Sequence, residues 1–223
     1  MSTLATLDPD TGALRVSWRG WLALRADQGQ WGADREALAA LADVGALHDG
    51  ELAPALGRAM QAVREPLARF RLVRRGVDAA GWLDADAGVV LVPRGPDLFE
   101  PTLASVAFLC DLVGRLVDLG PRTLSERPPV RTSPAELASA IASEDRPAAN
   151  TNLPAVRDHW EFELRGPSKE GPLARIEVLD TDQGWWQTSP SGQAVTASPC
   201  SATSVWRQLS LAVDWAVSGE RTQ

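Results

Sequence analysis

The amino-acid sequence predicts an α+β protein built from two related halves, each an antiparallel sheet covered by helices. One basis is the alternation of segments with helical apolar spacing and segments in which apolar and polar residues alternate. The other is a repeated order of strand, Gly-Trp strand, turn, strand, proline and helix, found around residues 81–92 (GWLDADAGVVLV) and again around residues 184–197 (GWWQTSPSGQAVTA). Because each sheet needs cover on its apolar face, we expect the halves to pack about a pseudo-twofold axis.

The N-terminal half is expected over residues 1–120. Asp34 is a candidate N-cap for its first helix, and Gly45 is a stop signal at the other end. Apolar residues then alternate, with Phe70 and Leu72 on one face of a strand. The expected elements are, in order, a strand within 8–18, helices over 32–47 and 50–66, strands over 67–75, 80–84 and 88–93, and a helix over 101–118.

A connector rich in Pro, Ser and Ala is expected over residues 121–154, and the C-terminal half over residues 155–223. Ser133, followed by Pro134 and Glu136, is a helix start signal within the connector. The C-terminal half is expected to contain strands over 159–166, 173–182, 184–189 and 193–198 and a helix over 201–218. The three parts are expected to form one globular protein.

Composition argues against nucleic acid and membrane partners. The 223 residues carry a formal net charge of −7, and the 22 basic residues are scattered among 29 acidic ones, whereas a nucleic-acid binder normally has a basic face. The strongest apolar run, residues 101–120, is interrupted by Asp111 and Arg115, so it reads as a core helix rather than a membrane span. Residues 1–25 lack the pattern of a signal peptide. We therefore expect a cytoplasmic location.

No pattern for catalysis, a cofactor or a metal site stands out, and none of these is expected. The two histidines, His48 and His159, lack a neighbouring nucleophile or metal-ligand pattern. Cys110 and Cys200 have no spacing typical of a disulfide framework or a zinc site. The sequence therefore favours a binding protein over an enzyme.

Tryptophan is the most unusual feature, with nine residues in the chain. Large aromatic side chains are enriched both in cores and at the centres of protein interfaces. In a strand, Trp185 and Trp186 point to opposite faces, so one ring enters the core and the other needs cover from a partner, a loop or the other half. We predict a protein-binding surface that contains Trp185, Trp186, Val195 and Trp206.

Residues 35–76 (REALAALADVGALHDGELAPALGRAMQAVREPLARFRLVRRG) resemble the EspG family of actinobacterial chaperones, which serve the type VII (ESX) secretion system. The similarity lies in a helix ending at Val44-Gly45, a second helix with the pattern L.P.L...L....P, and a strand of alternating residues. The resemblance implies a cytosolic, non-enzymatic chaperone. Its client would be a PE/PPE-type or WXG-type helical secretion substrate whose apolar helices it keeps soluble.

Three alternatives stay open at this point. An immunity or regulatory protein could neutralise a basic toxin or effector through the acidic surface, and its binding would then be sensitive to salt. An enzyme of another type could use His159 or His48 with nearby carboxylates. A structural subunit would instead associate with itself.

Overall fold

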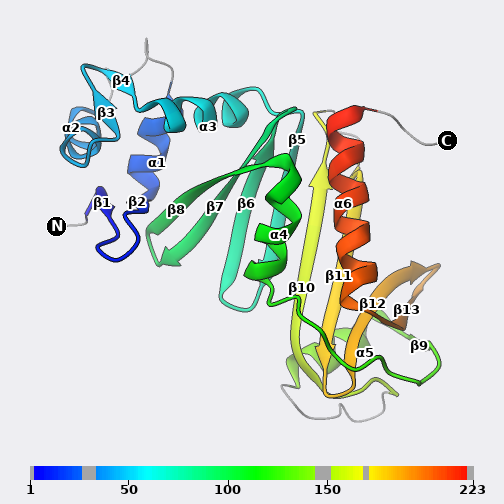
Figure 1. Ribbon diagram of the computed structural model, residues 1–223. Coiled ribbons are helices and arrows are strands. Elements are labelled where there is room, and N and C mark those ends of the chain that lie inside the picture. Colours follow the sequence, from blue (N-terminus) through cyan, green and yellow to red (C-terminus); the bar gives the residue numbers. More distant parts are fainter. Residues whose placement is uncertain (1–2, 27–33, 144–151, 168–170, 220–223) are drawn as a thin grey trace. The chain divides into compact units, whose positions relative to one another are not determined.

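The computed structural model describes residues 3–26, 34–143, 152–167 and 171–219 (Figure 1). It confirms the α+β class. The chain divides into two compact units, one formed by Met1–Arg69 and Ala79–Leu109, the other by Phe70–Asp78 and Cys110–Gln223. Each unit has its own set of antiparallel strands and its own helices.

The first unit combines three helices with strands in the order β1-β2-β8-β7-β6. Its helices are α1 (Trp18–Arg25), α2 (Arg35–Asp43) and α3 (Pro54–Arg64). Its strands are β1 (Ala5–Leu7), β2 (Leu14–Val16), β6 (Val77–Leu83), β7 (Ala87–Gly95) and β8 (Leu98–Ser105), with a separate hairpin of β3 (Leu47–His48) and β4 (Glu51–Leu52). Trp21 of α1 and Trp82 of β6 meet in the core of this unit, with ring centroids 5.4 Å apart.

Local signals explain how these helices begin and end. The Asp34 side chain accepts a hydrogen bond from the Ala37 backbone N–H, as expected of the N-cap. Gly45 has φ +73°, a left-handed conformation that ends the helix without a steric penalty. Helix α1 was not expected, although Ser17 caps it by accepting a bond from the Gly20 N–H.

The expected helix over 101–118 is wrong at its N-terminal end. Residues 98–105 form β8, and the helix α4 covers only Val106–Leu116. A proline can start a helix, which made Pro101 read as a first turn, but Pro101 instead pairs with Leu91 of β7. A strand tolerates proline where its missing N–H faces an open edge, and β2 pairs with β8 only at Phe99.

The second unit has strands in the order β5-β10-β11-β12-β13-β9. The strands are β5 (Ala68–Arg74), β9 (Val130–Thr132), β10 (Val156–Arg165), β11 (Ala174–Thr181), β12 (Gly184–Ser191) and β13 (Ala194–Cys200). The helices are α5 (Pro134–Ala142) and α6 (Ala202–Ser218), together with most of α4. In β5, Phe70 and Leu72 are buried on one face as expected.

Helices cover both faces of this sheet. Figure 1 shows α6 in front of β11 and β12, and α5 behind the lower ends of the strands. Helix α6 buries Val205, Leu209 and Val213. Helix α5 starts with the expected capping box at Ser133 and buries Leu137 and Ala140 against the opposite face.

The order of elements repeats along the chain. The series α3-β5-β6-β7-β8-α4 is followed by the series α5-β10-β11-β12-β13-α6. Each series is thus a helix, four successive strands and a second helix, which is the repeated order that the sequence indicated. Among the described helices, none combines the length and apolar character needed to cross a membrane.

Candidate protein-binding surfaces

Trp185 and Trp186 point to opposite faces of β12, as the strand period requires, but both rings are buried. The exposed fraction is 1% for Trp185 and 0% for Trp186. Both residues therefore lie in the core here, and the predicted binding role of one of them stays a prediction. Neither ring is accessible to a partner in this conformation.

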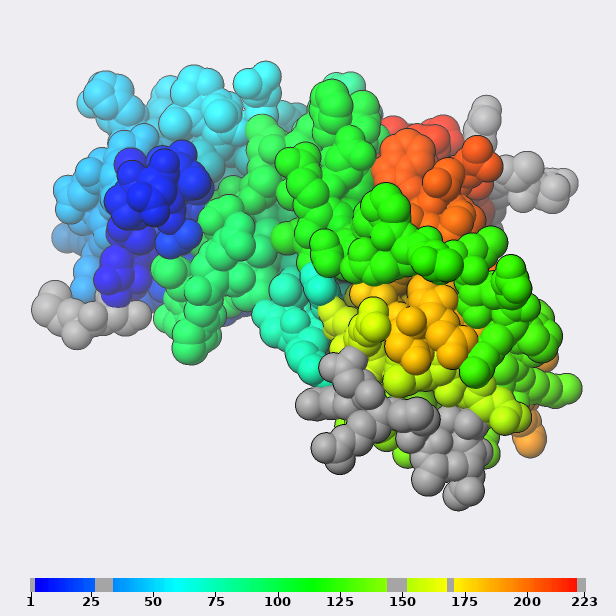
Figure 2. Space-filling model, turned by 60° about the horizontal axis from the view of Figure 1, so that its bottom comes forward, coloured from blue at the N-terminus to red at the C-terminus, as the bar shows by residue number. Residues whose placement is uncertain are grey.

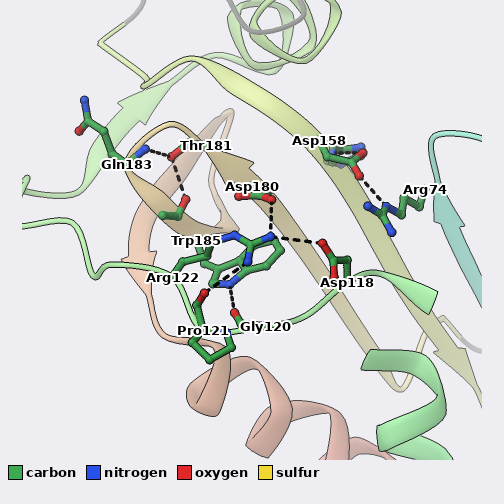
Figure 3. A network of polar contacts seen from close by, with 12 residues as sticks. Arg74, Asp118, Gly120, Pro121, Arg122, Asp158, Asp180, Thr181, Gln183 and Trp185 are labelled. Atoms are coloured by element: carbon green, nitrogen blue, oxygen red, sulfur yellow. Dashed lines mark hydrogen bonds and ion pairs between the residues drawn. The ribbon is translucent and has the colours of Figure 1, made fainter. Parts of the chain in front are cut away.

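A segment that follows α4 covers Trp185 (Figure 3). The Trp185 Nε1–H donates to the Gly120 carbonyl at 2.8 Å, and the Arg122 guanidinium lies 5.1 Å from the ring centroid. Arg122 is held there by Asp118 and Asp180, each with a carboxylate oxygen 3.3 Å from Nη2. The indole thus has a hydrogen-bond partner and a cation above its face, and a loop of the same chain provides the cover.

Helix α5 covers Trp186. The ring belongs to a buried cluster with Leu137, Leu153, Leu179 and Ala197. Trp186 therefore contributes to the core that attaches α5 to the sheet.

Val195 is half-buried on the same face, where α5 and the strands leave a groove of about 380 Å³. Its walls are mostly apolar. The groove is lined by Pro134, Leu137, Ala138, Ile141, Arg175, Glu177, Thr188, Pro190 and Val195. Val195 thus borders an open, largely apolar groove between a helix and a sheet, and a binding role for it stays a prediction.

Two residues of the groove lining, Glu177 and Thr188, belong to a polar row across β10, β11 and β12. The Glu177 carboxylate lies in the middle, with His159 Nε2 3.0 Å from Oε1 and the Thr188 hydroxyl donating to Oε2 at 2.5 Å. Hydrogen bonding to His159, and then to Thr188, lowers the pKa of Glu177 from its usual value of 4.5, against the opposing effect of burial. The carboxylate is thereby fixed in its ionised form beside the apolar walls.

We predict that the ionised Glu177 carboxylate of this polar row stabilises the fold in a pH-dependent way. Because the folded-state pKa of Glu177 is depressed, the contribution is complete above about pH 4.5 and is lost as the pH falls below it. Urea unfolding at pH values from roughly 3 to 7 covers this titration. Glu177→Gln should lower the free energy of unfolding at neutral pH, and this free energy should then fall less steeply than that of the wild type as the pH is lowered. Glu126→Gln, which removes an exposed carboxylate without an ion pair among the described residues, should leave the decline unchanged. An equally steep decline in Glu177→Gln would contradict this assignment.

Trp206 lies on α6 and is 41% exposed. Its Nε1–H donates to Asp111 of α4 at 3.3 Å, and the ring borders a mainly polar hollow of about 480 Å³ between the two helices.

Further along α6, Leu211 is 68% exposed and borders a second hollow of about 440 Å³ with Ile176 and Trp215. Leu211 was not among the residues singled out from the sequence. Its exposure could have been predicted, because Leu211 lies outside the apolar stripe of this helix.

Val195 and Trp206 do not share a surface. Val195 lies on the face of Trp186, where α5 packs. Gln187 follows Trp186 in β12, so its side chain points to the other face of the sheet. There it forms a hydrogen bond with Gln208 of α6, the helix that carries Trp206. The four predicted residues are therefore two core tryptophans and two separate surface positions.

Comparisons with known proteins address the fold. No protein-family model matches the chain, and no curated protein matches it in sequence. Among solved structures, the chain is similar to the Mycobacterium tuberculosis type VII secretion system chaperone EspG5, solved in complex with the PE25–PPE41 dimer. The TM-score is 0.60 at 12% sequence identity, and the match covers 91% of this chain and 96% of that one. The chain therefore has an EspG-like fold over nearly its whole length.

Proposed function

We propose that this protein is a cytoplasmic, non-enzymatic chaperone that binds an apolar helical segment of a PE/PPE-type or WXG-type substrate of type VII secretion. The observation that carries the proposal is the near full-length match in fold to a chaperone solved with a PE–PPE dimer. The resemblance of residues 35–76 to the EspG family supports the same role. Fold alone does not define function, so the proposal also needs a surface suited to such a client.

The groove between α5 and the sheet is the surface we propose for the client. An amphipathic helix binds by placing apolar side chains, spaced at one turn, into an apolar groove. Ala138, Ile141 and Val195 offer such walls, and about 380 Å³ of space admits side chains rather than a whole helix. Glu177, which is part of the groove lining, suits a client that has a basic or hydrogen-bond-donating residue next to its apolar one.

Charge-introducing substitutions test this assignment with a purified PE–PPE dimer from the same organism. Ala138→Glu and Val195→Glu should weaken binding by about tenfold or more, because a carboxylate would be buried against an apolar client. Leu211→Glu is the matched control on the other face and should stay within about twofold of wild type. Ala138 is exposed on α5, so its substitution carries little risk to folding.

The outcomes separate the two faces. Trp206→Ala belongs in the same titration, since Trp206 is the remaining surface position proposed from the sequence. Loss of affinity in Leu211→Glu or Trp206→Ala, with both groove variants unaffected, would move the binding surface to α6. Wild-type affinity in all four variants would contradict both surfaces.

Salt dependence distinguishes the proposal from a toxin-neutralising role. Apolar helix recognition should change little between about 50 and 500 mM salt, whereas capture of a basic toxin by an acidic surface should weaken steeply over this range.

A further inference from the structure

Another hollow, separate from the groove under α5 and from the two hollows beside α6, lies at one end of the second unit. It measures about 650 Å³ and is formed by the segment leading into β9, the segment leading into β10, and the β11–β12 turn. In Figure 2 these segments, green, yellow-green and gold, come together on the face turned forward. The hollow is lined by Arg127, Pro128, Pro129, Val130, Arg131, Asn152, Leu153, Pro154, Ala155, Asp182 and Gln183.

The floor of this hollow is fixed by packing. Leu153 is 3% exposed and belongs to the cluster under α5, and Ala155 is also buried. The Ala155 carbonyl accepts a hydrogen bond from the Asp182 backbone N–H at 3.0 Å, which ties the turn to the segment before β10. Arg131 stands on β9, in register with Thr196 of β13. The side chains around the hollow are therefore held on an ordered frame.

The guanidinium groups of Arg127 and Arg131 make no ion pair or side-chain hydrogen bond within the described part of the chain. Five other arginines of the same unit have carboxylate partners. These pairs are Arg71 with Asp78, Arg74 with Asp158, Arg122 with Asp118 and Asp180, Arg165 with Glu163, and Arg175 with Glu161. Of the arginines without such a partner among the described residues, Arg127 and Arg131 are the two that line this hollow.

Hydrogen-bond donors exceed acceptors in this hollow. Each guanidinium has five N–H donors and no acceptor, and the side-chain amides of Asn152 and Gln183 add two donors each. In Figure 3 the Gln183 side chain extends away from the Thr181 hydroxyl that its backbone N–H contacts. Asp182 is the single carboxylate among the described lining residues, and it forms no ion pair with either arginine there. The hollow therefore suits a ligand rich in acceptors and negatively charged.

We infer that this hollow binds an acidic, extended segment of a protein partner, with a carboxylate between Arg127 and Arg131. Arginine pairs with carboxylates through its planar fork of donors. Three prolines in the lining, Pro128, Pro129 and Pro154, provide apolar surface. A bound peptide would cover this surface, whereas a single inorganic anion would leave it exposed to water. Peptide carbonyls also match the amides of Asn152 and Gln183. The inference does not depend on the chaperone role.

An NMR titration of the full-length protein tests it. The probe is a capped hexapeptide of alternating glutamate and alanine, and the comparison peptide has glutamine in place of glutamate. The acidic peptide should shift signals of residues around the hollow, and the glutamine peptide should bind at least about tenfold more weakly. Raising the salt concentration should weaken binding of the acidic peptide.

A pair of double variants separates the site from overall charge. Arg127→Gln/Arg131→Gln should reduce the affinity by about tenfold or more. Arg157→Gln/Arg207→Gln removes two exposed arginines that also have no ion pair among the described residues but do not line the hollow, and it should stay within about twofold. Equal losses in both double variants, equal binding of the two peptides, or no binding to wild type would overturn the inference. Inorganic phosphate binding as tightly as the acidic peptide would overturn the assignment to a peptide.

Discussion

Replacing Trp186 with alanine is expected to lower the free energy of unfolding by about 3–5 kcal/mol. The indole is completely buried between α5 and the sheet, in contact with a cluster of leucines that cannot close the space its removal would leave. Its loss would also weaken the attachment of α5, which forms one wall of the groove. Urea unfolding followed by far-UV circular dichroism measures the effect.

Two further variants identify the cause of that loss. The Trp186 Nε1–H has no hydrogen-bond partner among the residues that the structure describes. Trp186→Phe should therefore cost only about 1–2 kcal/mol, because most of the apolar volume is kept. Trp206→Ala removes a tryptophan of the same size from a position that is 41% exposed and should cost less than about 1 kcal/mol. A Trp186→Ala variant as stable as Trp206→Ala would contradict the buried position.

Gly184→Ala is expected to destabilise the protein by about 2–5 kcal/mol. Gly184 follows the two-residue β11–β12 turn and has φ +103°, a conformation that is strained for any residue with a Cβ. A Cβ there would lie 2.0 Å from the Thr123 carbonyl oxygen, a backbone atom of the segment that covers Trp185. The substitution should therefore both strain the turn and displace the segment from the indole ring. Thermal unfolding and the fluorescence of the tryptophans report these two effects.

Gly192→Ala is the matched control, because Gly192 also has a positive φ, +66°, but no atom lies within 4 Å of the position its Cβ would take. It should cost about 1–2 kcal/mol, the penalty of the left-handed conformation alone. A Gly184→Ala variant no less stable than Gly192→Ala would show that the segment over Trp185 does not approach the turn as described.

Local signals in the sequence predicted local structure well. The caps at Asp34 and Ser133, the alternation of Phe70 and Leu72 in β5, and the opposite directions of Trp185 and Trp186 are all present. These features depend on a few neighbouring residues, so a pattern in the chain is enough to reveal them.

The errors concern contacts between distant segments. Trp185 was expected to need cover, but the sequence could not indicate that Gly120 and Arg122 provide it, since Gly120 is 65 positions away from Trp185 and Arg122 is similarly distant. Pro101 reads equally well as a helix start and as an edge-strand residue, and its pairing with Leu91 decides between them. The groove beside Val195 arises because α5 packs across three strands, which no single stretch of sequence encodes.

Co-expression with a PE–PPE dimer of the same organism tests the chaperone proposal most directly. Expressed alone, the dimer is expected to aggregate; with this protein, it should appear in the soluble fraction and elute as a complex of defined mass by size-exclusion chromatography with light scattering. Ala138→Glu should abolish that complex, and Leu211→Glu should preserve it. A dimer whose solubility and elution are the same with and without this protein, across the PE–PPE and WXG-type proteins of the organism, would contradict the proposed function.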